Sequence, residues 1–309
     1  MKAMQLFREF SLRVIKRHVT LSLRSVFVGK VLRRLVKMSR SGYHRDATHL
    51  VDLANHLFFK EFKDRDFTFV LDGERVKVHK TIIKVTSEKF GKLFDEWAKE
   101  GVTSVSVETT AIGGDPIGLK TFKLFIQFCY TGSLNWKETD DIIVLELLAL
   151  CHEYGYSEFA SVLGDAVKSK GFMNIWNVWY FFEASNTYQL QALRDTCIRF
   201  IDRHAMEALN EERMVAIDAT ALKNVLCRNT LFAKEVEILK TIINYLTVNK
   251  STGDIPKTLL DTIRWSLITQ REFTEIVLPT GLVDEKFYEE RKGKKEEERY
   301  DPDNPPSRY

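Results

Sequence analysis

The chain has 309 residues, which is long enough for about two domains, and its 44% hydrophobic and 12% aromatic residues are enough for packed cores. Its net charge of +3 is unevenly distributed: residues 1–45 hold 12 Lys/Arg and one acid, residues 284–309 hold 7 Lys/Arg and 9 Asp/Glu, and the remaining 27 bases and 33 acids give residues 46–283 a net charge of −6. A mildly acidic body gives no support to a nucleic-acid-binding role. The sequence contains no run of about 18 apolar residues, so no membrane span is predicted.

Residues 1–45 form a basic head with a net charge of +11, in which Glu9 is the one acid. The stretch is rich in Arg and contains several Ser, a composition typical of a mitochondrial transit peptide. It is also typical of an amphipathic helix on anionic lipid, and a disordered extension with no role in the fold is the third reading. We expect the chain to be cytoplasmic, with mitochondrial targeting by the head as the alternative.

An apolar stripe follows the head. Leu50, Leu53 and Leu57 recur at helical spacing within residues 48–62, with Phe58 beside them. A short amphipathic helix of this kind needs another surface to cover its apolar face. The pattern leaves two candidates for that surface, the rest of the same domain or a second copy of the chain.

Residues 66–79, DFTFVLDGERVKVH, carry the sequence signature of a β-hairpin. Apolar residues alternate in FTFVL and again in ERVKV, which places them on one face of each strand. The Asp72-Gly73 pair between the two runs predicts a type I′ turn, because both central residues of that turn need positive φ. A hairpin this short needs a third strand or a covering helix to bury its apolar face.

Between the hairpin and residue 155, the sequence predicts helices interrupted by one returning strand. Ser87 is a good N-cap, Gly101 ends the helix that follows it, and Gly132 suits the left-handed position after a later helix. Asp140-Asp141 open a helix that is apolar nearly all round and is therefore expected to be buried. The predicted elements are a short helix over 81–85, a helix over 88–100, a strand over 102–107, and helices over 117–131 and 142–155. This order predicts an α+β fold.

Five motifs along this region resemble the BTB/POZ domain. They occur in the family's order and spacing over about 48–155, and no single one would suffice. The motifs are Asp66-Phe-Thr-Phe-Val, Val78-His-Lys, Ser87-Glu-Lys-Phe, Phe128-Cys-Tyr-Thr-Gly and Leu148-Ala-Leu-Cys-His-Glu-Tyr. The resemblance implies a small sheet with clustered helices.

From residue 157 to about 290 the sequence predicts only helices, and it resembles the all-α BACK region that follows many BTB domains. Two antiparallel amphipathic helices are expected around a turn at Asn186-Thr187, with Trp176 and Trp179 in the phase of the first helix. Three further stretches, 152–159, 226–246 and 263–283, resemble one branch of the family whose members continue into β-rich domains. We expect a BTB/POZ domain over 46–156, a BACK domain over 157–290 and a disordered, charged, proline-containing tail over 291–309.

Motifs of enzymes and metal sites are missing from the sequence. The seven His residues show no HExxH or paired-ligand spacing, and no GxSxG, P-loop or GxGxxG motif occurs. We therefore expect no enzyme activity, no cofactor and no metal site. His79 lies at a strand-to-helix junction, where a histidine is expected to satisfy a backbone group in the core rather than bind a ligand.

The four cysteines are widely spaced within apolar helical patterns, and no CxxC pair occurs. Neither a disulfide framework nor a zinc site is indicated. Cys129, Cys151, Cys197 and Cys227 are therefore expected to be reduced and buried thiols.

The family resemblance implies a dimer. In BTB domains the first helix packs across the dimer axis, which assigns Leu50, Leu53 and Leu57 to a dimer interface. Asp66 and Lys80 match the acid and base that many BTB dimers bury near that axis. The family usually has Arg at the second position, and Lys lacks the bidentate fork of a guanidinium.

The resemblance also implies a docking site for cullin-3. A hydrophobic-x-Glu signature before the third strand falls on Ala98-Lys99-Glu100. Glu100 is kept, whereas Ala98 stands where the family has a large apolar anchor, and interface energy concentrates in such anchors. Trp97 is rotated by about 100° from Ala98 on a helix and is expected to serve the core.

The expected function is therefore binding, as a dimeric adaptor that links a cullin-3 type ubiquitin ligase to a target protein. The alternative is a ligase-independent scaffold that acts by homo- or hetero-oligomerisation. Adaptors of this kind usually carry a separate target-reading module after BACK, whereas residues 290–309 are fewer than one kelch repeat of about 50 residues. Either the BACK surface reads the target or the chain is a short form.

Overall fold

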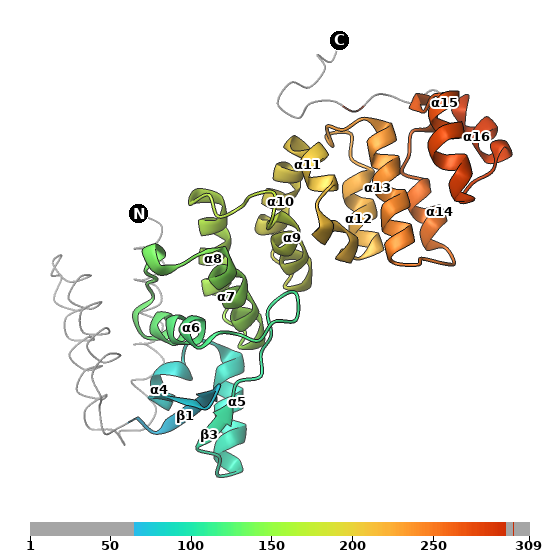
Figure 1. Ribbon diagram of the computed structural model, residues 1–309. Helices are drawn as coiled ribbons and strands as arrows, with labels where there is room; N and C mark the ends of the chain where they lie inside the picture. Colours follow the sequence, from blue (N-terminus) through green and yellow to red (C-terminus); the bar gives the residue numbers. More distant parts are fainter. Residues whose placement is uncertain (1–64, 295–298, 300–309) are drawn as a thin grey trace. The chain divides into compact units, whose positions relative to one another are not determined.

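The computed structural model describes residues 65–294 and Arg299 (Figure 1). The basic head and the predicted dimer helix over 48–62 lie outside these residues. The chain divides into two compact units between Leu163 and Gly164. Within the described part of the chain, no helix is long and apolar enough to cross a membrane.

The first unit is built on a three-stranded sheet in the order β2-β1-β3. β1 (Phe67–Leu71) and β2 (Glu74–Val78) are antiparallel, and β3 (Ser104–Ser106) is parallel to β1. The turn residues Asp72 and Gly73 have φ of 51° and 78°, so both are left-handed, as the predicted hairpin requires.

Burial in the hairpin follows the alternation of its sequence. Phe67, Phe69 and Leu71 are buried while the residues between them are half-exposed. The register pairs Phe69 with Val76 and Phe67 with Val78, so both strands turn their apolar side chains to one face. The helices of the unit cover that face.

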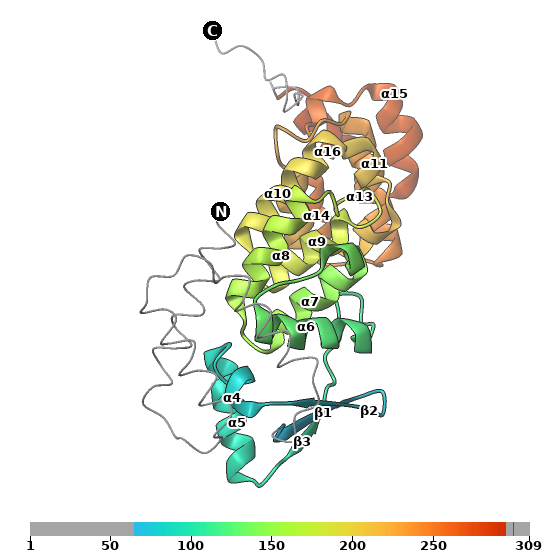
Figure 2. The same cartoon turned by 90° about the vertical axis from the view of Figure 1, so that its left-hand side faces the viewer.

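Helices follow the hairpin in the predicted order, and the small sheet with its helices confirms the α+β fold. They are α4 (Lys80–Ile83), α5 (Glu88–Lys99), α6 (Leu119–Thr131), the 3-10 turn η1 (Trp136–Glu138), α7 (Asp141–Glu153) and α8 (Ser157–Ser169). Figure 2 shows the hairpin from its edge, with α6 and α7 packed on each other. The predicted caps are confirmed: Ser87 accepts from the Phe90 N–H, Asp140 accepts from the Ile143 N–H, and Gly132 has φ of 64°.

A tight joint connects α5 to the end of α7. The Ser87 hydroxyl that caps α5 also donates to the Tyr154 carbonyl at 2.5 Å, and the Tyr154 ring stacks on Phe90 with centroids 4.3 Å apart. Gly155 follows with φ of 65°, and a Cβ placed there would lie 2.9 Å from the Cβ of Lys89. Both the backbone conformation and the close approach therefore require glycine.

The second unit is entirely helical within the described residues. Its helices are α9 (Val178–Thr187), α10 (Gln191–Arg203), α11 (Ala205–Leu209), α12 (Ala219–Leu226), α13 (Glu235–Val248), α14 (Ile255–Leu260), α15 (Gln270–Glu272) and α16 (Glu285–Lys292). Short 3-10 or π turns occur at η2 (Glu212–Ala216), η3 (Trp265–Leu267), η4 (Phe273–Val277) and η5 (Leu278–Thr280). α9 and α10 pack side by side as the predicted helical pair.

Two details of this pair differ from the prediction. α9 continues through Thr187, and the chain reverses at Gln189, whose φ is 57°. The prediction placed the turn too early because glutamine is not a residue that marks a turn in a sequence. Trp176 lies before the helix and is 74% exposed, whereas Trp179 is fully buried and donates to the Ala208 carbonyl at 2.7 Å. The prediction for Trp176 was wrong because the helix begins two residues later.

The cysteines also differ in one respect. Cys129, Cys151 and Cys197 are buried, and all four cysteines are free thiols. Cys227 is exposed, contrary to the prediction, because it is the C-cap of α12 and α12 ends at Leu226. Its apolar neighbours in the sequence belong to the buried face of that helix.

The joint at Gly155 can be tested with a matched pair of variants. We expect Gly101→Ala to lower the free energy of unfolding by about 1 kcal/mol, because its φ of 71° strains an L-residue while nothing lies within 4 Å. Gly155→Ala should cost at least about 1 kcal/mol more, because Lys89 crowds the new methyl. Urea denaturation measures both. Equal losses would show that the close approach contributes nothing.

Candidate protein-interaction site

The end of α5 forms an exposed corner that an aromatic cluster holds in place. The Trp97 ring stacks on Phe67 of β1, with centroids 5.2 Å apart and planes 14° from parallel. Its edge meets Phe94 at 5.1 Å. Trp97 is half-buried and packs against rings of the core, on the side that its phase on the helix predicted. This contact fixes the last turn of α5 against the sheet.

Ala98, Lys99 and Glu100 are exposed on this corner. Glu100 is the C-cap of α5, and its N–H reaches back to the Glu96 carbonyl at 3.2 Å. Gly101 then turns the chain with φ of 71° toward β3. The predicted docking triplet is thus contiguous, presented to solvent and supported from behind by the aromatic cluster. Its role in cullin binding stays a prediction.

Asp66 and Lys80 are in contact in the structure, through the backbone N–H of Lys80 and the side chain of Asp66. The Lys80 N–H donates to the Asp66 carboxylate at 2.8 Å, while the Lys80 ammonium lies 5.5 Å from the centroid of the Phe67 ring. Asp66 thus joins the start of β1 to the first residue of α4. It is exposed and Lys80 is half-exposed. A place for this pair near a dimer axis stays a prediction, as does the interface assigned to Leu50, Leu53 and Leu57.

His79 is a structural residue whose partner is a side chain. It is 3% exposed, its N–H donates to the Tyr130 hydroxyl at 2.8 Å, and its Nδ1 lies 2.8 Å from the same oxygen. The sequence predicted only a backbone group as its partner, because no local pattern points to a tyrosine 51 positions away. Burial raises the pKa of Tyr130 well above its ordinary value, so the hydroxyl stays neutral and joins the hairpin to α6.

Three other titratable groups of this unit are buried in its core. Burial raises the pKa of the Cys129 and Cys151 thiols, which keeps them protonated. Burial, and secondarily the Glu153 charge, raises the pKa of Tyr154 to about 12. Among the described residues, no group of three or more His, Cys, Asp or Glu side chains is arranged to hold a metal ion.

One buried polar cluster contains none of the predicted site residues. It lies in the second unit around Glu235 and includes Arg299 from the region expected to be a disordered tail. Its members come from distant parts of the sequence, so no local motif marks it.

Comparison with known proteins gives two family matches. The BTB/POZ domain family matches residues 55–171, and the BACK family, "BTB And C-terminal Kelch", matches residues 178–278. Similar proteins include BTB/POZ domain-containing protein 9 of Bos taurus and of Homo sapiens, each 26% identical over 221 residues. The protein of the same name from Drosophila melanogaster is 23% identical over 267 residues.

These alignments cover 71% of the chain for the two mammalian proteins and 80% for the fly protein. They cover 34% or 35% of the relatives, so the chain spans about a third of the length of the curated proteins it matches. Residues 152–159, 226–246 and 263–283 had indicated resemblance to this same group of proteins.

The bond between His79 and Tyr130 yields a stability prediction. Tyr130→Phe should lower the free energy of unfolding by about 1–3 kcal/mol, because a buried N–H and an imidazole nitrogen lose their common partner. Tyr180→Phe, the same substitution at a half-exposed ring, is the control and should change stability by less than about 0.5 kcal/mol. Chemical denaturation checks both, and equal effects would contradict the structural role of His79.

Proposed function

Because the chain belongs to the BTB/POZ family and carries a BACK domain after its BTB/POZ domain, we propose that it is a dimeric adaptor linking a cullin-3 type ubiquitin ligase to a target protein. Both domains are protein-interaction modules and are generally not catalytic. The proposal adds to this a specific partner and a specific docking surface.

One observation carries the proposal: the exposed triplet Ala98-Lys99-Glu100 at the fixed end of α5. A docking surface costs less free energy to bind when it is already ordered. Trp97 supplies that order, since its ring is stacked on Phe67 behind the triplet. Glu100 adds an exposed carboxylate that can pair with a basic or hydrogen-bonding group of the partner.

Ala98 is the weak point of this surface. Hot spots are usually large side chains that fill a pocket on the partner, and a methyl group fills little of one. The loss of one such anchor costs more than about 1 kcal/mol, which is more than about fivefold in affinity. The proposed complex is therefore weaker than that of a relative with a large residue at this position.

A ligase-independent scaffold is the second candidate, and the small side chain of Ala98 favours it. Such a scaffold would need only the oligomeric state. The apolar stripe of Leu50, Leu53 and Leu57 supports self-association in both cases, so the two functions differ in cullin binding alone.

Docking can be tested by gain of function. We expect Ala98→Met to tighten cullin-3 binding by about tenfold, because it restores a large apolar anchor, and Glu100→Lys to weaken it by a similar factor. Ala192→Met, at an exposed position of α10, is the matched control and should leave binding unchanged. Titration of the purified full chain with cullin-3 gives the affinities.

No binding by either the wild type or Ala98→Met would contradict the adaptor and leave the scaffold. An unchanged affinity in Ala98→Met, with binding present, would place the docking surface elsewhere.

Self-association is tested by sedimentation of the full chain at tens of micromolar. We expect the wild type to be a dimer and Leu53→Asp to be a monomer, because a charge in an apolar interface has no partner. Thr48→Asp adds the same charge outside the leucine stripe and should remain dimeric. A monomeric wild type would remove the dimer and would leave the scaffold only with hetero-oligomerisation.

A further inference from the structure

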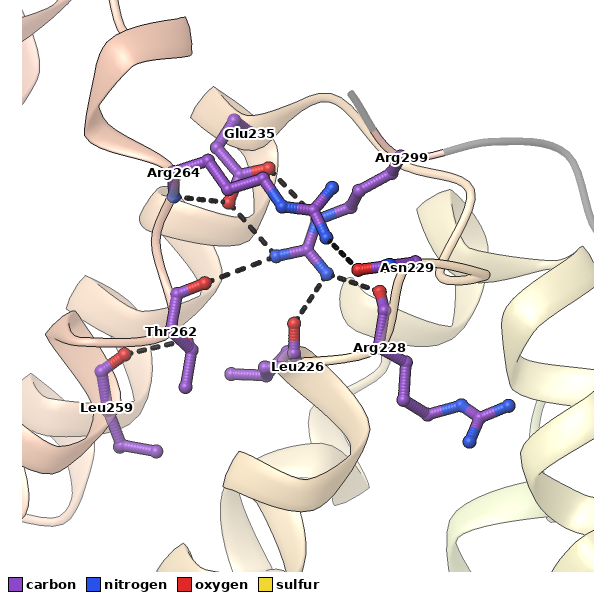
Figure 3. A network of polar contacts seen from close by, with 8 residues as sticks. All are labelled: Leu226, Arg228, Asn229, Glu235, Leu259, Thr262, Arg264 and Arg299. Carbon is purple, nitrogen blue, oxygen red and sulfur yellow. Dashed lines mark hydrogen bonds and ion pairs between the residues drawn. The ribbon is translucent and has the colours of Figure 1, made fainter. Parts of the chain in front are cut away.

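An arginine from the C-terminal region is buried in the second unit. Residues 291–309 were expected to form a disordered tail, yet α16 extends to Lys292 and the side chain of Arg299 is only 2% exposed. It pairs with Glu235, the first residue of α13, whose side chain is 3% exposed. Figure 3 shows the guanidinium enclosed by acceptors from several segments.

The guanidinium is fully hydrogen-bonded. Its Nε and Nη2 donate to the two carboxylate oxygens of Glu235, each at 2.9 Å, in a bidentate pair. Nη1 donates to the carbonyls of Leu226 at 2.5 Å and Arg228 at 2.7 Å. Nη2 also donates to the Thr262 carbonyl at 3.3 Å. These bonds use all five N–H donors of the side chain.

The acceptors belong to the helical framework of the unit. Leu226 ends α12, where backbone carbonyls carry partial negative charge. Thr262 follows α14 after a turn in which its N–H donates to the Leu259 carbonyl at 3.0 Å. Glu235 is oriented by the Arg264 N–H, which donates to its Oε1 at 2.9 Å. We call the set formed by Glu235 and the carbonyls of Leu226, Arg228 and Thr262 the arginine pocket.

A second buried acid holds the loop that supplies the Arg228 carbonyl. Asp202 of α10 is 2% exposed and binds the Arg228 guanidinium through Nε at 3.2 Å and Nη2 at 2.8 Å. The Thr230 hydroxyl donates to the same carboxylate at 2.6 Å, and the Phe232 N–H donates to the Asp202 carbonyl at 3.2 Å. The loop is thus fixed by contacts that do not involve Arg299.

The pocket selects a guanidinium. A lysine ammonium has three donors at one point and cannot span a carboxylate and three separated carbonyls. An apolar side chain would leave the buried Glu235 charge without a counter-charge, which is strongly unfavourable. All five bonds come from the side chain of Arg299, so they require an arginine and nothing from the residues beside it.

We propose that the arginine pocket is a peptide-binding site that recognises one arginine side chain of an extended segment, and that Arg299 is its intramolecular occupant. An arginine-bearing segment of a partner protein binds when it displaces Arg299. The proposal concerns target recognition by the BACK unit and holds whether or not the chain binds cullin-3.

The test supplies the tail in trans. The probe is a fluorescent peptide with the sequence of residues 293–307, in which Arg299 is the one arginine. The full-length Arg299→Ala chain, whose pocket has lost its occupant, should bind this peptide. The wild-type chain should bind at least about tenfold more weakly, because its own arginine competes at a high effective concentration. Fluorescence anisotropy measures both.

Two controls test whether binding depends on the arginine side chain of the peptide and on Glu235 of the pocket. A peptide with Arg299→Lys should lose at least about tenfold in affinity for the Arg299→Ala chain, although its net charge is unchanged. The double variant Arg299→Ala/Glu235→Gln should bind the original peptide equally weakly. Equal binding of the two peptides, or of the peptide by wild type and Arg299→Ala, would overturn the proposal.

The Arg299→Ala chain could unfold, since it leaves Glu235 buried without its counter-charge, and circular dichroism would detect this. The wild-type chain then provides the test, with isotope-labelled arginine side chains observed by NMR. Excess unlabelled peptide should shift and deprotect the Nε–H signal of Arg299, whereas the Arg299→Lys peptide should not. An Arg299 signal that does not respond to the original peptide would overturn the proposal.

Discussion

The ring of Phe69 joins the parts of the first unit. It sits in the middle strand of a sheet too small to bury its own apolar face, and it is fully buried. Its centroid lies 5.2 Å from Phe122 of α6, 6.3 Å from Phe90 of α5 and 6.4 Å from Tyr154 beyond α7, each edge-on. Edge-to-face contacts of this kind add to the gain from burial. The orientation of α5, and hence the exposed corner at its end, depends on this cluster.

The second unit relies on a different kind of contact, the buried ion pair. Aromatic packing sums over many contacts, each of which contributes little by itself. A buried ion pair is directional, and removing one partner leaves a charge in a poorly solvating interior. Glu235 and Asp202 are both buried acids, and each is matched by a guanidinium with additional hydrogen bonds. Two such networks give this unit specificity that its apolar core alone would lack.

The parts of the fold that the sequence predicted correctly are mostly those set by a few adjacent residues. The hairpin turn, the Ser87 cap and the Gly132 terminus each depend on a few adjacent residues, so the sequence contains the whole cause. The features that could not be predicted arise from contacts across the chain. Tyr130 meets His79 from 51 positions away, and Arg299 meets Glu235 from 64 positions away. A charged, proline-containing tail looks disordered because composition is an average, and one buried arginine does not change that average.

An occupied pocket sets a threshold for any partner. A free segment must overcome an arginine tethered to the same chain, whose effective concentration is of millimolar order for a short flexible linker. A partner's single arginine cannot bind the pocket much more tightly than Arg299 does, because both side chains make the same five hydrogen bonds. A successful partner therefore needs contacts beyond the pocket, or two arginine segments joined together. In the proposed dimer two pockets would be available, and a bivalent partner would displace the second tail without a further loss of translational freedom. Dimerisation and arginine recognition would then be linked energetically even though they lie on different domains.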